Sequence, residues 1–93
     1  MFKRLNKQGV RSIENGCVLQ RMDRYCYHYE EDSHIMKIIV EPGIKAEELF
    51  FGPDSRWDPP HHNVAISTAE LGRIRKNLAD ALSFMGIAHK FSI

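Results

Sequence analysis

The first half of the chain alternates between apolar and polar residues with the two-residue period of β-strands. Residues 10–21 read as a hairpin, because Asn15-Gly16 is a preferred pair for a two-residue type I′ turn. In residues 24–30 the alternation is strict, and it places Tyr25, Tyr27 and Tyr29 on one face of a strand. The pattern therefore predicts at least three strands before residue 31.

The next stretch predicts further strands. Residues 35–40 form the most hydrophobic run and indicate a central strand, which Pro42-Gly43 ends as a turn. Residues 44–51 return with a charged middle and an apolar end, and we expect a strand in their second half, with a helix as the alternative. At the end of the chain, residues 87–93 alternate again and predict a terminal strand.

One helix is predicted over residues 68–85. Ser67 and Glu70 have the spacing of a capping box, in which each side chain satisfies a free amide at the helix start. Apolar residues then recur at intervals of three and four, and Gly86 comes next as a helix terminator. The members of this stripe are Leu71, Ile74, Leu78, Ala81, Leu82 and Met85.

These elements predict an α+β fold with two layers. We expect an antiparallel sheet of about five strands, with the long carboxy-terminal helix packed on one face and a terminal strand completing the sheet. The chain has 93 residues, a length typical of a single domain, so residues 1–93 are expected to form one.

The charge is unevenly distributed along the chain. Residues 1–24 contain six Lys or Arg and two Asp or Glu, whereas residues 25–58 contain three and eight. Such asymmetry can steer a charged partner, although it is equally typical of solvated faces that simply differ. The overall formal charge is only +1.

Composition favours a protein of the cytoplasm. The apolar runs are shorter than the roughly 18 residues of a membrane span, and the basic start is not followed by the apolar stretch of a secretion signal. The two cysteines, Cys17 and Cys26, are too few for a disulfide scaffold and fit a reducing compartment.

Catalytic, cofactor and metal signatures are weak. The glycines do not form a phosphate-binding loop, and the adjacent His61 and His62 cannot readily form a compact ligand pair. We therefore predict no cofactor, no metal site and no enzymatic activity. An acid–base pair drawn from the five histidines, as in a metal-independent ribonuclease, remains the enzymatic alternative. Those histidines are His28, His34, His61, His62 and His89.

The segment before the helix is the best candidate for contact with a partner. Arg56, Trp57 and Asp58 present a cation, an aromatic ring and an anion in succession, and Pro59-Pro60 stiffens the next part of the loop. Trp and Arg are enriched in interface hot spots, but a single Trp in a small protein also commonly fills the edge of the core. Both roles stay open at this point.

Residues 55–93 resemble the small immunity proteins of bacterial polymorphic-toxin and contact-dependent inhibition systems. The resemblance lies in Ser55-Arg56-Trp57-Asp58-Pro59-Pro60, then Ile66-Ser67-Thr68-Ala69-Glu70, then a helix and a closing strand. Many of those proteins carry a W-x-x-P loop followed by an I-S-x-x-E helix start. The resemblance implies a non-enzymatic cytoplasmic protein that binds a cognate toxin domain, commonly a nuclease, and occludes its active site.

The expected partner-binding residues come from this loop and the neighbouring acids: Arg56, Trp57, Asp58, Asp54, Glu47 and Glu48. The alternative function is a small nucleic-acid-binding protein, which would use Lys3, Arg4, Lys7, Arg11, Arg21 and Arg24. A third possibility is a homodimer formed through a sheet edge or through the helix face with Gly72, Ala79 and Ser83.

Overall fold

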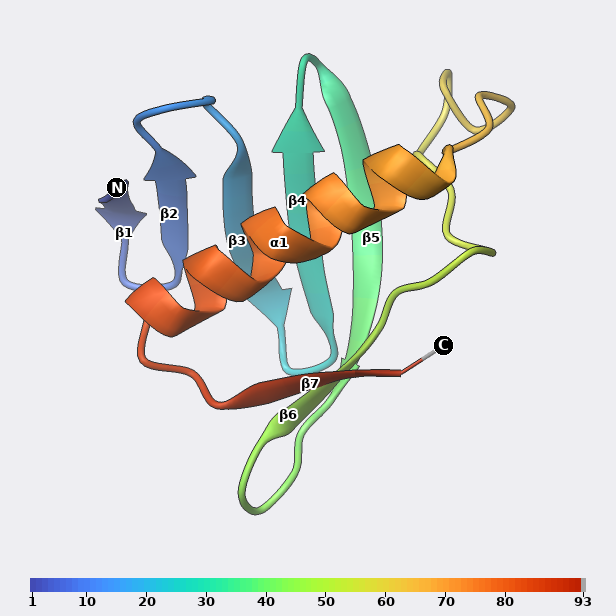
Figure 1. Ribbon diagram of the computed structural model, residues 1–93. Coiled ribbons are helices and arrows are strands. Elements are labelled where there is room, and N and C mark those ends of the chain that lie inside the picture. The colour runs from blue at the N-terminus through green and yellow to red at the C-terminus, as the bar shows by residue number, and fades with distance from the viewer. Residues whose placement is uncertain (93) are drawn as a thin grey trace.

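The computed structural model describes residues 1–92 and has the two layers predicted from the sequence, one sheet and one helix (Figure 1). Seven strands form the sheet: β1 (Phe2–Asn6), β2 (Gly9–Ser12), β3 (Val18–Asp23), β4 (Cys26–Glu31), β5 (His34–Glu41), β6 (Glu47–Phe50) and β7 (His89–Ser92). The helix, α1 (Thr68–Phe84), runs diagonally across one face of this sheet (Figure 1). The α+β prediction is thus confirmed.

The strands lie side by side in the order in which they occur along the chain, from β1 to β7. Neighbours from β1 to β6 pair antiparallel, as short turns between consecutive strands require. β7 pairs parallel to β6, with Leu49 opposite Phe91. This pair is parallel because α1 connects the two strands in the sequence and returns the chain to the end of the sheet where β6 begins.

The sheet is larger than expected from the sequence, with seven strands instead of about five. The six strand-like runs of the sequence correspond to β2–β7, and the strand without a recognised run is β1, in which only Phe2 is partly buried and the other four residues are exposed. An edge strand with so little burial has no apolar alternation to reveal it. Its ladder with β2 supplies the pairing that the side chains do not signal.

The type I′ turn predicted at Asn15-Gly16 is wrong, and a turn of this kind lies elsewhere in the sheet. β2 and β3 do form a hairpin, but the connection spans Ile13 to Cys17, and only Gly16 has a positive φ, of 77°. The two-residue turn with positive φ at both positions lies between β4 and β5, at Asp32 (48°) and Ser33 (66°). Asp tolerates this left-handed conformation better than most residues, so the Asp32 turn is the one that fits type I′ geometry.

The predicted helix is confirmed at both ends. The Ser67 hydroxyl accepts from the Glu70 amide at 3.1 Å, and the Glu70 carboxylate accepts from the Ser67 amide at 3.2 Å. Gly86 has a φ of 76°, the conformation favoured just after a helix. Within the apolar stripe, Ile74 and Leu78 are fully buried. The capping box and the stripe together fix where α1 begins and which side faces the sheet.

The core lies between α1 and one face of the sheet. Its sheet side is built by positions that pair across the strands: Val10, Leu19, Tyr29, Met36, Tyr27, Ile38, Val40 and Leu49. The intervening positions of each strand point to the opposite face, which α1 does not cover. We call this the open face of the sheet. Within residues 1–92, no helix is long and apolar enough to cross a membrane.

Candidate partner-binding surface

The segment between β6 and α1 lies against the first part of β5. β6 pairs only with residues Ile39 to Glu41 of β5, which leaves the earlier part of that strand without a ladder on this side. There the Asp58 amide donates to the Ile35 carbonyl at 2.7 Å. The predicted contact loop is therefore held against the sheet edge by its own backbone.

Trp57 lies in the core, with 4% of its surface exposed. Its ring stacks on Tyr29 with 6.3 Å between centroids and meets the edge of His34 at 5.3 Å. Of the two roles left open by the sequence, the structure shows the packing role. A partner therefore has almost none of the indole surface to touch, and any contact by this loop falls to the neighbours of Trp57.

Those neighbours differ in accessibility. Arg56 is exposed, and its guanidinium donates to the carbonyl oxygens of Pro53 (3.1 Å) and Ser55 (2.9 Å). These bonds hold the side chain near the loop surface. Asp58 is half-buried and Asp54 is exposed. Arg56 and Asp54 thus remain available to a partner.

The two adjacent acids predicted for the interface point to opposite faces. Glu47 faces the helix side, where it accepts from the Tyr27 hydroxyl at 2.7 Å and from Arg21 at 2.5 Å. The side chains of Arg21 and Glu47 are only 13% and 21% exposed. Burial together with the bond to Glu47 raises the pKa of Tyr27 to about 12. Glu47 is therefore committed to an internal ion pair.

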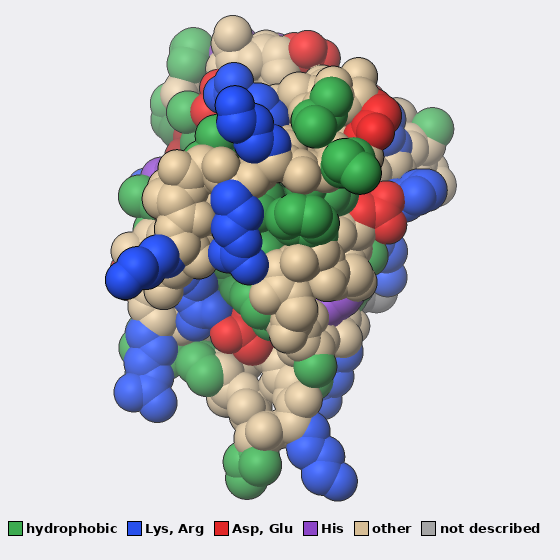
Figure 2. All heavy atoms as spheres, turned by 90° about the vertical axis from the view of Figure 1, so that its left-hand side faces the viewer, with side chains coloured by type: hydrophobic (Ala, Val, Ile, Leu, Met, Phe, Trp, Pro, Cys, Tyr) green, Lys and Arg blue, Asp and Glu red, His purple; other side chains and the backbone are tan. Residues whose placement is uncertain are grey.

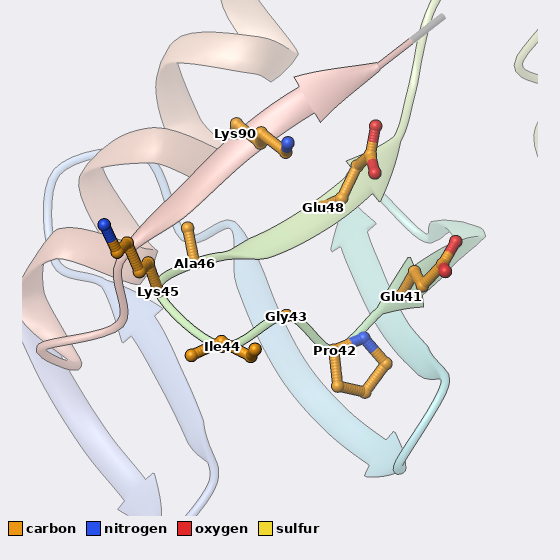
Figure 3. A pocket seen from close by; sticks show the side chains of 8 residues that line it. All are labelled: Glu41, Pro42, Gly43, Ile44, Lys45, Ala46, Glu48 and Lys90. Atoms are coloured by element: carbon orange, nitrogen blue, oxygen red, sulfur yellow. The ribbon is translucent and has the colours of Figure 1, made fainter.

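Glu48 lies on the open face, because it pairs with Glu41 on β5 and with Lys90 on β7. It is half-buried and accepts a hydrogen bond from the Ser92 hydroxyl. Glu41, Glu48 and Lys90 lie in a row across three strands and line a hollow of about 250 Å³ beside the β5–β6 turn. Figure 3 shows these side chains rising from three adjacent strands, with Ile44 at the tip of the turn.

A second hollow, of about 280 Å³, lies one step further along the same strands. Ile39 and Phe50, which are cross-strand partners, line it together with the loop residues Gly52 and Asp54. Ile39 is 57% exposed and Phe50 is 40% exposed, while Ile44 at the hairpin tip is fully exposed. We call the set Ile39, Ile44, Glu48, Phe50 and Asp54 the β5–β6 surface.

The sequence offered partial signals for this surface. It identified Glu48 and Asp54 as contact residues but passed over Ile39, Ile44 and Phe50. The two-residue period of a strand could have identified Ile39 as an outward position, because it places Ile39 on the same face as Lys37. Ile44 comes directly after Pro42-Gly43, a turn in which an apolar side chain has no core to enter.

A polar network connects Arg73 and Asn77 of α1 to β4. The Tyr29 hydroxyl donates to Glu31 at 2.6 Å and accepts from the Asn77 amide at 2.9 Å. Arg73 donates to both Glu31 oxygens at 2.6 Å. Burial and the bond to Glu31 raise the pKa of Tyr29, and Glu31 raises the pKa of Arg73. Two small hollows, of about 100 and 150 Å³, flank the Arg73–Glu31 pair.

Two of the five histidines come together. His34 and His61 stack with their ring centroids 3.7 Å apart, and His34 also lines the hollow of about 150 Å³ that Trp57 borders. Among the described residues, no group of three or more His, Cys, Asp or Glu is placed to hold a metal ion.

Comparison of the chain with family models, with curated proteins and with solved structures gives no match in any of the three. The geometry and charge of the molecule are therefore the basis for assigning a function.

Proposed function

We propose that this chain is a non-enzymatic binding protein that engages a folded protein partner through the β5–β6 surface. Its specific form would be an immunity protein that occludes the active site of a cognate bacterial toxin domain. The sequence resemblance over residues 55–93 suggests that form, and the general binding role does not depend on it.

The carrying observation is the group of apolar side chains that the β5–β6 hairpin exposes. Ile39, Ile44 and Phe50 lie around two hollows on a face that α1 leaves uncovered. Interface centres combine such apolar anchors with pockets that receive side chains from the partner, and a polar rim surrounds them. Here Glu48, Asp54 and Lys90 supply the rim.

The charged residues on the β5–β6 surface indicate what kind of partner it would bind. The segment 25–58 carries most of the acids, but Glu31 is paired with Arg73 and Glu47 with Arg21. The β5–β6 surface keeps Glu48 and Asp54 alongside Lys37 and Lys90. A surface of mixed sign fits a partner with mixed charge around an apolar site better than it fits a strongly basic one.

The test uses the carboxy-terminal domain of the protein encoded directly upstream of this gene as the probe. Isothermal titration should show binding by the wild type and a 10- to 100-fold weaker affinity for Ile39→Ser and Phe50→Ser, since hot-spot truncation costs about 1.4–3 kcal/mol. The matched control is Ile13→Ser, an apolar residue 63% exposed in the β2–β3 connection.

Equal loss of affinity in the control would contradict the assignment of the surface. A probe domain that the wild type does not bind would contradict the immunity form. In that case, lysine cross-linking of the wild type and of Phe50→Ser in the source cell, with identification of the linked protein and titration of the purified pair, tests the general binding role.

A further inference from the structure

The β1–β2 hairpin carries a concentration of positive charge that the proposed function does not use. Lys3, Arg4, Lys7 and Arg11 are all exposed, and residues 1–13 contain no Asp or Glu. The ion pairs of the described residues involve other cations: the amino terminus, Arg21, Arg73 and Lys76. Within residues 1–92, the four hairpin cations therefore have no anionic partner.

The hairpin arranges these cations as a short track. Lys3 and Arg11 are cross-strand partners on the open face, so their side chains lie next to each other. Lys7 lies at the turn, about 13 Å further along at roughly 3.3 Å per residue. Arg4 leaves β1 on the helix side, opposite Val10, but its guanidinium donates to the Lys7 carbonyl at 2.9 Å, which brings the fourth cation to the same turn.

Protection of the sheet edge explains only part of this charge. Natural sheets place charged residues on edge strands to prevent pairing with another chain, and β1 is such an edge. Arg11, however, belongs to β2, which is paired on both sides. Figure 2, which faces this side of the molecule, shows Lys and Arg side chains standing out along it with fewer Asp or Glu between them.

We infer that the β1–β2 hairpin binds the phosphodiester backbone of nucleic acid. Phosphates repeat about every 3.4 Å along each strand of a duplex, so a track of this length can meet several of them. The structure narrows the cations available for this role. Arg21 is held in the half-buried pair with Glu47, and Arg24 lies in the β3–β4 turn. The hairpin lies at the opposite side of the sheet from the β5–β6 surface, so this inference is independent of the proposed function.

The experiment measures fluorescence anisotropy of a labelled 20-nucleotide poly-uridine and of a labelled 20-base-pair DNA between 50 and 200 mM NaCl. With four phosphate contacts, log K should fall against log salt with a slope of about −2.8 for the single strand or about −3.6 for the duplex. These slopes correspond to about 50-fold and about 150-fold weaker binding over that range. The two probes show which form of backbone is preferred.

Two variants with the same change in net charge locate the site. The first replaces Lys3, Arg4, Lys7 and Arg11 by Gln, and the second replaces Arg24, Lys37, Lys45 and Lys90 by Gln. The inference predicts that binding is lost only in the first. Single variants Lys7→Gln and Arg11→Gln, which perturb the edge less, should each flatten the slope by about 0.7 to 0.9.

Three results would overturn the inference. The first is an equal loss of affinity in both fourfold variants, and the second is a wild type that does not bind at 50 mM NaCl or whose affinity does not fall with salt. The third is competition by poly-glutamate as effective as that by unlabelled RNA. The last result would assign the hairpin to acidic polypeptides. None of these results bears on the β5–β6 surface, whose test uses a protein probe.

Discussion

The buried hydroxyl of Tyr27 should make the protein lose stability at alkaline pH by a calculable amount. Tyr27 is 0% exposed, and its hydroxyl donates to Glu47 and accepts from Arg21 at 2.9 Å. Its pKa is raised from 10.0 to about 12, first by burial and then by the bond to Glu47. The fold therefore favours the neutral phenol.

The sign depends on which state loses its proton first. Below pH 10 both states hold the proton, and the stabilising contribution is complete. Between pH 10 and pH 12 the unfolded chain ionises while the folded one does not, so the free energy of unfolding falls as the pH rises. At pH 11 the loss from Tyr27 amounts to about 1.4 kcal/mol.

The comparison of the wild type with Tyr27→Phe isolates the contribution of Tyr27 to the free energy of unfolding, because the other titrating groups are present in both proteins. At pH 8 the variant should be less stable by about 1–2 kcal/mol, the cost of removing a buried hydroxyl with two partners. At pH 11 the two proteins should have nearly equal stability. Urea unfolding followed by far-ultraviolet circular dichroism at both pH values, with a reductant present, measures the difference.

Tyr25→Phe is the matched control, since Tyr25 is 56% exposed and its hydroxyl makes no bond among the described residues. Its stability relative to the wild type should be the same at pH 8 and at pH 11. A constant difference for Tyr27→Phe across this range would refute the reasoning, because it would mean that the folded state does not disfavour the phenolate.

Four further substitutions test the geometry of the structure. Trp57→Ala should lower the free energy of unfolding by about 3–5 kcal/mol in urea titrations, whereas Arg56→Ala should change it by less than about 0.5 kcal/mol. Glu31→Gln should cost about 1–3 kcal/mol in the same assay, because the Arg73–Glu31–Tyr29 network loses its charged acceptor. Gly43→Ala should shift amide resonances around the β5–β6 turn, since its Cβ would lie 2.2 Å from the Ala46 carbonyl oxygen. An unshifted spectrum would contradict that geometry.

The helix and most strands could be predicted because local signals and tertiary packing agree there. The Ser67–Glu70 capping box and the apolar stripe act within a few residues of each other, and the same stripe is what the sheet buries. The alternation of β4 likewise reflects one buried face, and the apolar run of β5 supplies the residues that the core buries at every second position. Where one pattern serves both the element and the core, the sequence is sufficient.

The candidate site was harder to predict because it depends on contacts between distant residues. Nothing around Trp57 in the sequence reveals that Tyr29 and His34 lie beside it and close over the ring. Glu47 and Glu48 are the same residue type at adjacent positions. Because successive side chains of a strand point to opposite faces, Glu47 pairs with Arg21 and Glu48 lies on the open face. These roles depend on which face each residue points to and which residue lies beside it, and the assembled sheet determines both.

The open face itself is the strongest reason for a binding role. A helix of 17 residues is about 25 Å long and about 10 Å wide, so α1 covers one face of a seven-stranded sheet and leaves the other bare. On a solvated face the outward positions of β5 should resemble Lys37, yet Ile35 and Ile39 occupy them and Phe50 lies opposite Ile39. These side chains add little to the core, because Ile39 and Phe50 remain 57% and 40% exposed. Burial by the proposed partner would account for their apolar character, because contiguous exposed apolar side chains are typical of interaction sites.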